Sequence, residues 1–199
     1  MQALKLFAGR RGLHVAAASV ALLACGVAEA HPGHGEHGLM AGLAHPLGLD
    51  HLLAMVAVGA WSALALPARR AALGPVVFML GLLAGALLGM VTGSLSGVEA
   101  LVATSVVLFG ALLAGGRRWS LSVGLSLIGV SAVVHGLAHG AEWPVATSAV
   151  AYVGGFLAST AVLHASGLTL GLLARHASSR VWQVAGTLLG GAGLWLLAR

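Results

Sequence analysis

Long apolar stretches dominate this chain and constrain its fold more than any other feature. Of its 199 residues, 59% are hydrophobic and only 8% are charged, whereas a soluble domain carries about 25% charged residues. Six apolar stretches lie near residues 46–66, 73–93, 98–115, 121–141, 146–173 and 181–198. Each is close to the roughly 20 residues that a helix needs to cross a bilayer. We therefore predict an all-α, polytopic membrane protein with six transmembrane helices.

The first thirty residues have the three parts of a secretory signal peptide. Lys5, Arg10 and Arg11 form a basic start, residues 15–24 form an apolar centre, and Ala28-Glu29-Ala30 is a small-residue cleavage site. The sequence thus predicts three parts in chain order. These are a signal peptide (1–30), an external His-rich segment (31–44) and a six-helix transmembrane domain (45–199).

Two alternatives to cleavage stay open for this N-terminal segment. It can remain as an uncleaved first helix, or Leu23-Ala24-Cys25-Gly26 can act as a lipobox in which Cys25 is lipidated. If cleavage follows Ala30, the mature chain has no cysteine. Disulfides and thiolate metal ligands are then excluded.

Charges between the apolar stretches orient the predicted helices. Arginines follow the first, third and fifth stretches, whereas the alternate loops carry glutamates and neither Lys nor Arg. The residues concerned are Arg69, Arg70, Arg117, Arg118, Arg175 and Arg180 on one side, and Glu99 and Glu142 on the other. By the positive-inside rule the arginine loops are cytoplasmic. Both ends of the mature chain then lie in the periplasm of a bacterial inner membrane, in agreement with the signal peptide.

Two polar segments interrupt the apolar helices, and this topology places both in the outer half of the membrane. Together they hold His45, Asp50 and His51 of the first stretch and His135, His139 and Glu142 of the fourth. Ionisable groups at membrane depth are costly and therefore indicate function. Imidazole and carboxylate together form a transition-metal ligand set. We predict that the two segments are halves of one metal entry site.

The two segments differ in how their polar residues are placed around a helix. His135, His139 and Glu142 are spaced i, i+4 and i+7 and share one helix face. His45 and His51 do not share a face, so they need a kink or cap at the intervening proline, a residue that favours the first helical turn. The alternative is that these histidines are structural and bond to nearby backbone, Ser or Thr groups.

Three residues, Asp50, Met55 and His164, have roles that the sequence leaves open. Asp50 can bind a metal directly or orient a His ring. Met55 offers a thioether but is more often a packing residue. His164, deeper in the fifth stretch, can be a lower metal site, a proton acceptor or a buried structural residue.

Most glycines are predicted to serve helix packing, as in the four-residue repeat Gly81, Gly85, Gly89 and Gly93. Three others, Gly48, Gly136 and Gly140, lie beside the polar side chains and can leave room for an ion.

The segment after the cleavage site is rich in histidine and glycine. Because it is too polar and glycine-rich for a helix, we predict an external segment. His31, His34 and His37 can capture metal from outside, since short His-rich tracts often bind metal. The alternative is a plain linker.

Several partner classes are excluded by the sequence. No Gly-rich loop ends in Gly-Lys-Ser/Thr, so there is no P-loop for ATP. No basic patch with interleaved aromatic residues points to nucleic acid. The expected partners are a transition metal ion and the lipid bilayer, and a homo-oligomer stays open.

With these residues in place, the chain resembles the HupE/UreJ family of nickel permeases. The first-helix pattern of that family, His then Asp-His, is matched by His45, Asp50 and His51, and the fourth-helix pattern His-Gly-x-x-His-Gly-x-Glu is matched by residues 135–142. The run 54–61 and the Leu163-His164 step also look like the family, although Val134 replaces its usual Phe.

The resemblance implies Ni²⁺ entry into the cytoplasm to supply a hydrogenase or urease, with no catalytic activity and no permanently bound cofactor. Ligand chemistry alone does not select nickel, because imidazole and carboxylate also suit Zn²⁺, Co²⁺ and copper. An intramembrane metal-dependent enzyme and a membrane metal sensor remain as alternatives.

Overall fold

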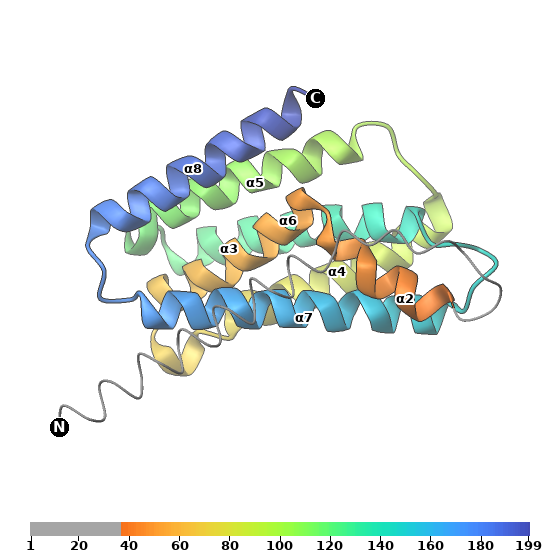
Figure 1. The fold of residues 1–199 in the computed structure, drawn as a ribbon, viewed down its shortest axis with the longest axis horizontal. Helices are drawn as coiled ribbons and strands as arrows, with labels where there is room; N and C mark the ends of the chain where they lie inside the picture. The colour runs from red at the N-terminus through yellow and green to blue at the C-terminus, as the bar shows by residue number, and fades with distance from the viewer. Residues whose placement is uncertain (1–36) are drawn as a thin grey trace. The chain divides into compact units, whose positions relative to one another are not determined.

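The computed structural model describes residues 37–199, and within that range every regular element is a helix. The elements are α2 (His37–Ala44), η2 (His45–Leu47), α3 (Leu49–Ala65), η3 (Ala68–Arg70), α4 (Leu73–Thr92), α5 (Val98–Gly115), η4 (Gly116–Arg118), α6 (Leu121–Ala141), α7 (Ala149–Leu173) and α8 (Ser179–Leu197). Figure 1 shows them as a helical bundle. The all-α prediction is confirmed. The predicted signal peptide, His31 and His34 lie outside the described residues.

Four helices of the described range are long and apolar enough to cross a bilayer. They are Ala68–Thr92, Val98–Arg118, Leu121–Ala141 and Ala149–Leu173. A fifth span results if the bent pair Gly38–Leu47 and Leu49–Ala65 counts as one. Helix α8 is not among them, and it carries Arg180 and Gln183 near its start. The protein is thus a multi-pass membrane protein, and its sixth span stays a prediction.

A sharp bend precedes helix α3. The segments Gly38–Leu47 and Leu49–Ala65 meet at 73°. Pro46 occupies the start of η2, and Gly48 has an extended backbone (φ −54°, ψ 143°) that caps α3. Both are expected at a helix boundary, because proline favours a first turn and glycine is a common N-cap residue. The predicted kink at Pro46 is therefore present.

Helix α2 was not expected from the sequence, which assigned residues 31–44 to an external segment. The helix packs along α7. A side chain at Gly42 would collide with the backbone of Tyr152, and one at Gly155 would collide with the backbone of Leu39. Glycine therefore lets the two backbones touch, and the apolar run from residue 38 to residue 44 packs against α7. The polar composition of residues 31–37 gave no indication of this contact.

Helices α4 and α6 interlock through glycines from both sides. A side chain at Gly85 would meet the carbonyl of Val133, and one at Gly136 would meet the carbonyl of Leu82. Small residues are the usual means of close helix approach in membranes. The predicted packing role is confirmed for Gly81, Gly85 and Gly89, whereas Gly93 caps the end of α4 with a φ of 70° and has no atom within 4 Å of where a side chain would begin. The suggestion that Gly136 and Gly140 leave room for an ion is wrong, because both face the α4 backbone.

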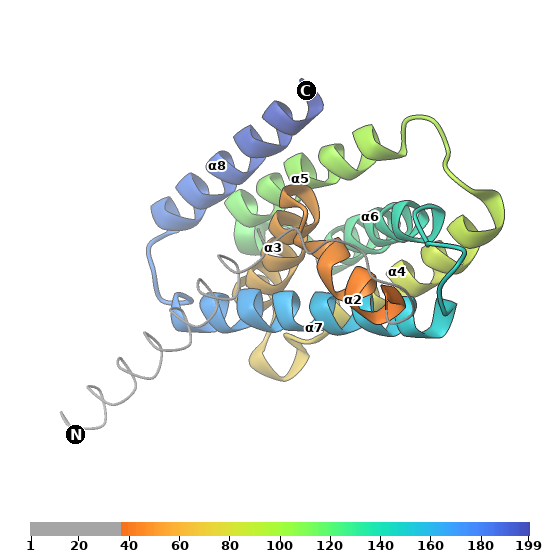
Figure 2. The ribbon, with the colours of Figure 1, turned by 45° about the vertical axis from the view of Figure 1, so that its right-hand side comes forward.

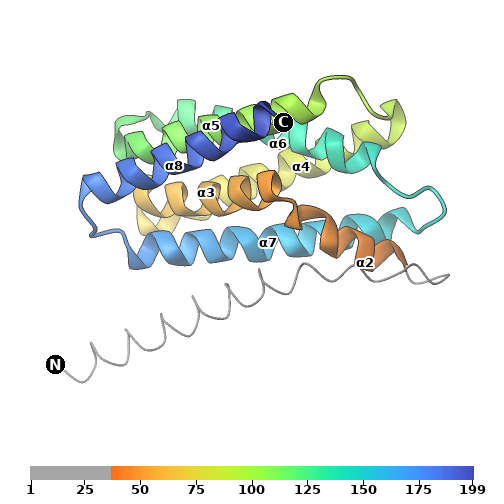
Figure 3. The same ribbon diagram turned by 45° about the horizontal axis from the view of Figure 1, so that its top comes forward.

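The same device joins two more helix pairs. Gly59 of α3 abuts the backbone of α7 at His164, and Gly110 of α5 abuts α8 at Gly186. The views in Figures 2 and 3 agree that α8 runs beside α5 and that α3 runs beside α7. Helix α8 is therefore part of the bundle. These pairings place α3, α6 and α7 around one buried region, in which the histidines lie.

Candidate metal site

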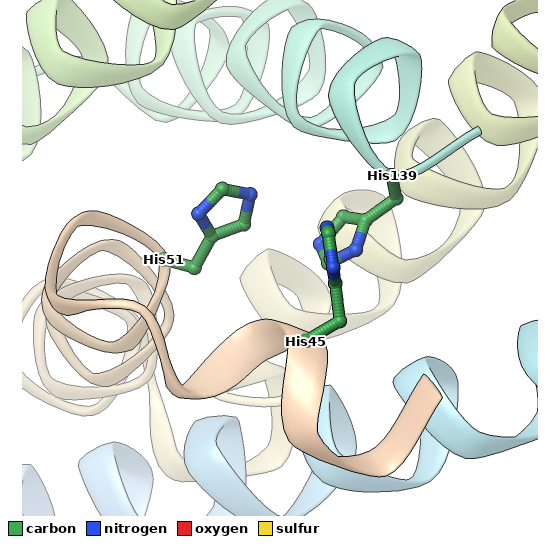
Figure 4. Close-up of side chains that lie close together, drawn as sticks. All are labelled: His45, His51 and His139. Carbon is green, nitrogen blue, oxygen red and sulfur yellow. The ribbon is translucent and has the colours of Figure 1, made fainter. Parts of the chain in front are cut away.

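Three histidines from separate segments converge at one point. His45 of η2, His51 of α3 and His139 of α6 each offer a ring nitrogen, and the three nitrogens lie within 4.8 Å of one another. Figure 4 shows the three rings meeting in the space between their helices. The bend at Gly48 turns His45 back over the start of α3 and so brings it to His51. The predicted pairing of the first and fourth apolar stretches is therefore present in the geometry.

Asp50 holds the ring of His51. Its Oδ1 accepts a bond from the backbone N–H of His51 at 2.8 Å and contacts the ring Nδ1 at 2.9 Å. A carboxylate in this position keeps the proton on Nδ1, so the lone pair is on Nε2. Nε2 is buried and has no partner among residues 37–199. Of the two predicted roles for Asp50, the geometry favours ring orientation.

His135 is held in the same way by a residue of another helix. The Ser105 hydroxyl donates to the carbonyl of Val102 at 2.7 Å, so its oxygen accepts from Nε2–H of His135 at 2.8 Å. The lone pair is then on Nδ1, which is buried without a partner in the described part of the chain. The His135 ring lies 4.7 Å from that of His51 between centroids. It is the next imidazole inward.

His139 lies at the centre of the cluster. Its ring centroid is 4.3 Å from that of His45 and 4.7 Å from that of His51. Phe156 stacks on the ring at 4.8 Å, and the Tyr152 hydroxyl donates to the His139 carbonyl at 3.0 Å. Neither ring nitrogen has a hydrogen-bond partner within residues 37–199. The α7 aromatics thus position His139 and leave both nitrogens available.

Exposure falls steadily from the end of the bundle inward. The side chain of Glu142 is 53% exposed and that of His45 is 19% exposed, and the two are 3.3 Å apart. His139 and His135 are fully buried. Partial burial and the charge of Glu99 raise the pKa of Glu142 above its usual value. The order of groups describes a path from an exposed carboxylate to buried imidazoles.

His164 lies farther along the same line, on α7. Its Nδ1–H donates to the carbonyl of Met55 at 2.8 Å, which leaves Nε2 with the lone pair and no partner in the described range. The ring of Phe78 lies between His164 and His135, with its centroid 4.9 Å from that of His164 and 5.5 Å from that of His135. Met55 thus contributes a backbone carbonyl, and its side chain packs in the core, which is the more usual of the two roles considered for it.

Several of these residues were not anticipated from the sequence. Some come from helices without a histidine motif, as Ser105 and Phe78 do, and others from turns of α7 far from His164, as Tyr152 and Phe156 do. Sequence spacing therefore gave no signal for them. His37 begins α2, but the structure describes only its backbone. His176 is exposed in the α7–α8 connection.

The cluster suits transition-metal coordination. Three nitrogens spaced evenly around one ion at about 2.1 Å each are about 3.6 Å apart. The nitrogens of His45, His51 and His139 lie within 4.8 Å, so the rings must approach one another by about an ångström to bind one ion together. Each of the buried rings of His51, His135 and His164 has one nitrogen tied and one free, as metal-binding histidines typically do.

Comparison with known proteins gives a consistent result. Residues 18–196 match the family model described as HupE / UreJ protein. The chain is 39% identical over 173 residues to "Protein HupE" of Rhizobium leguminosarum bv. viciae, and the alignment covers 86% of this chain and 90% of that relative. No protein of known structure matches the chain.

Proposed function

The chain belongs to the HupE/UreJ family, and on that premise we propose that it carries a divalent transition metal ion across the bacterial inner membrane into the cytoplasm. Ni²⁺ is the proposed ion, and a hydrogenase or urease is the proposed destination. The observation that carries the proposal is the inward sequence of partner-free imidazole nitrogens, which begins at an exposed carboxylate.

Capture begins at the exposed end. Glu142 attracts a dication electrostatically, and His45 beside it supplies the first nitrogen. The ion then reaches His51 and His139, where three imidazoles replace part of its water shell. The three can bind at once only after the slight closure described above. Weak, multi-site binding of this kind is what passage requires, since an ion must leave as readily as it enters.

Onward transfer uses the deeper histidines. His135 presents Nδ1 next to the His51 ring, so an ion can exchange one imidazole for another. Phe78 separates His135 from His164. Rotation of that ring would open the way to Nε2 of His164, the proposed lower site. The external segment with His31, His34 and His37 is proposed to collect the ion.

Nickel is proposed over cobalt or zinc because of the family, not because of the ligands. Imidazole and carboxylate bind several first-row ions, and affinity alone orders them by the Irving–Williams series. Co²⁺ and Zn²⁺ transport is therefore the nearest alternative. A competition experiment separates these ions.

The test is ion entry into liposomes that contain the purified full-length chain. Vesicles that enclose a metal-responsive dye receive Ni²⁺ outside, alone or with excess Co²⁺ or Zn²⁺. A saturable dye response that persists in excess Co²⁺ or Zn²⁺ supports the proposal. A metal that copurifies one to one and stays bound, with no entry above empty vesicles, would instead support an intramembrane metal-dependent enzyme.

A further inference from the structure

A cavity lies at the end of the bundle opposite the cluster of His45, His51 and His139. It has a volume of about 440 Å³ and lies between the end of α5 with η4 and the connection from α7 to α8. Its polar lining residues are Arg117, Arg118, Arg175, Ser179 and Gln183, and Trp182 also lines it. The metal path does not use any of these residues.

The charges in this cavity have one sign. Three arginines line it and no acidic residue does. Asp50, Glu99 and Glu142, the acidic residues of the described range, begin α3 and α5 or follow α6, so they lie at the other end of these helices. Both ion pairs found within residues 37–199 involve histidines at that other end. Within residues 37–199, no acidic side chain therefore neutralises the arginines there.

One arginine is anchored and so helps to shape the cavity. Nε of Arg117 donates to the carbonyl of Leu64, the penultimate residue of α3, at 3.0 Å. This bond uses one of five guanidinium N–H groups. The remaining donors of Arg117 stay available at the cavity wall.

A buried donor also lacks a partner at this cavity. Trp182 is only 8% exposed, and its indole N–H has no acceptor within the described residues. An unsatisfied buried donor costs about 1–3 kcal/mol, so an acceptor oxygen within reach of this N–H would be favourable. An indole can only donate. Indole and guanidinium groups thus require the same kind of ligand, one rich in acceptor oxygens.

We propose that this cavity binds a phosphate group, supplied either by the headgroup of an anionic phospholipid or by soluble phosphate. Arginine forks match phosphate oxygens in pairs, and the volume is large enough for a headgroup. The cavity lies at the ends of α5 and α7, both apolar enough to span a membrane, and basic pockets between helices at this level bind lipid headgroups elsewhere. The exposed Trp119 at the end of η4 is typical of the membrane interface.

The experiment uses the purified full chain in neutral detergent, depleted of lipid. Phosphatidylglycerol, phosphatidylcholine or inorganic phosphate is added in steps, and the midpoint of thermal unfolding reports binding, because a ligand of the folded state raises that midpoint. Two pocket variants are compared with wild type. They are the double variant Arg118→Gln/Arg175→Gln, which removes two charges, and Trp182→Phe, which removes the N–H donor and keeps a smaller aromatic ring.

We expect phosphatidylglycerol to stabilise the wild type at lower concentration than phosphatidylcholine does. The double variant should need at least about tenfold more lipid, and Trp182→Phe about fivefold more, in line with the loss of charge-assisted and neutral hydrogen bonds. The control Arg69→Gln/Arg70→Gln removes the same charge from exposed positions of η3 and should respond within about twofold of wild type.

The outcomes distinguish a lipid headgroup from soluble phosphate as the ligand, and both from the absence of a phosphate site. If phosphate reproduces the effect through the same residues and lipid does not, the site stands with a soluble ligand. The proposal is overturned if the control loses as much as the pocket variants, or if the anionic and zwitterionic lipids act alike on all proteins. It is also overturned if neither phosphate nor lipid stabilises the wild type.

Discussion

At the scale of single residues, the site depends on groups that hold one nitrogen of a histidine and leave the other free. Asp50 does this for His51, Ser105 for His135 and the Met55 carbonyl for His164. The sequence already suggested that Asp50 orients a ring, because the two are neighbours. It gave no sign of Ser105, which is 30 residues from His135 and meets it only through the packing of α5 on α6.

Replacing Asp50 tests this arrangement where it is strongest. Asp50→Asn keeps the shape but removes the charge that fixes the proton on Nδ1 of His51. We expect the dissociation constant for Ni²⁺ to rise about 10–100-fold, the usual cost of losing such a partner. Competition with a metal chelator measures it. Glu99→Gln removes a charge at the same end without touching a ring and should change affinity much less. Equal effects of the two variants would mean that Asp50 acts only through its negative charge and not by orienting the His51 ring.

Ser105→Ala tests the same principle on a neighbouring helix. Without the hydroxyl, the His135 ring loses its tautomer preference and a buried N–H loses its acceptor. We expect Ni²⁺ affinity to fall about tenfold and stability to fall by about 1 kcal/mol. The control is Thr104→Ala, whose hydroxyl bonds only its own helix. Unchanged affinity in Ser105→Ala would remove His135 from the metal path.

At the scale of helices, glycine contacts and one bend determine which side chains meet. Apolar length predicted α4 to α7, and Pro46 predicted the kink, since both are local signals. Helix α2 was missed because its helicity depends on a surface of α7 that no local pattern reveals. The roles of Gly136 and Gly140 were also misjudged, because a glycine beside a histidine looks the same in sequence whether it faces an ion or another backbone.

The α4–α6 contact gives a direct test at this scale. Gly85→Val would force a side chain into the Val133 backbone, so α6 must move away and carry His135 and His139 with it. Overpacking typically costs about 1–3 kcal/mol, and we expect lower thermal stability together with weaker Ni²⁺ binding. Gly154→Val adds the same side chain at a glycine of α7 with no atom within 4 Å. If both variants melt alike, the interlock of α4 and α6 is unimportant.

At the scale of the whole molecule, the two ends of the bundle have opposite chemistry. The clustered histidines His45, His51, His135 and His139 and the described acidic residues gather at one end, and the paired arginines lie at the other. The sequence predicted this separation from loop charges alone. It did not predict the arginine cavity, because that cavity needs η4 and the α7–α8 connection to approach each other.

The orientation of these ends is open to chemical labelling. In a Cys25→Ser background, Val145→Cys and His176→Cys place single thiols in exposed loops at opposite ends. The positive-inside rule predicts that a membrane-impermeant maleimide labels position 145 in intact spheroplasts and position 176 only after lysis. Labelling in the reverse order would contradict the assigned topology and the direction of entry.

The central claim is that the buried histidines carry an ion across the membrane. The most direct measurement is the initial rate of radiolabelled Ni²⁺ entry into proteoliposomes that contain equal amounts of wild type, His51→Ala, His135→Ala or His176→Ala. The last is a control, because His176 is exposed and distant from the site. We predict that His51→Ala and His135→Ala fall to the rate of empty vesicles while His176→Ala matches wild type. Wild-type rates in both site variants would contradict the account.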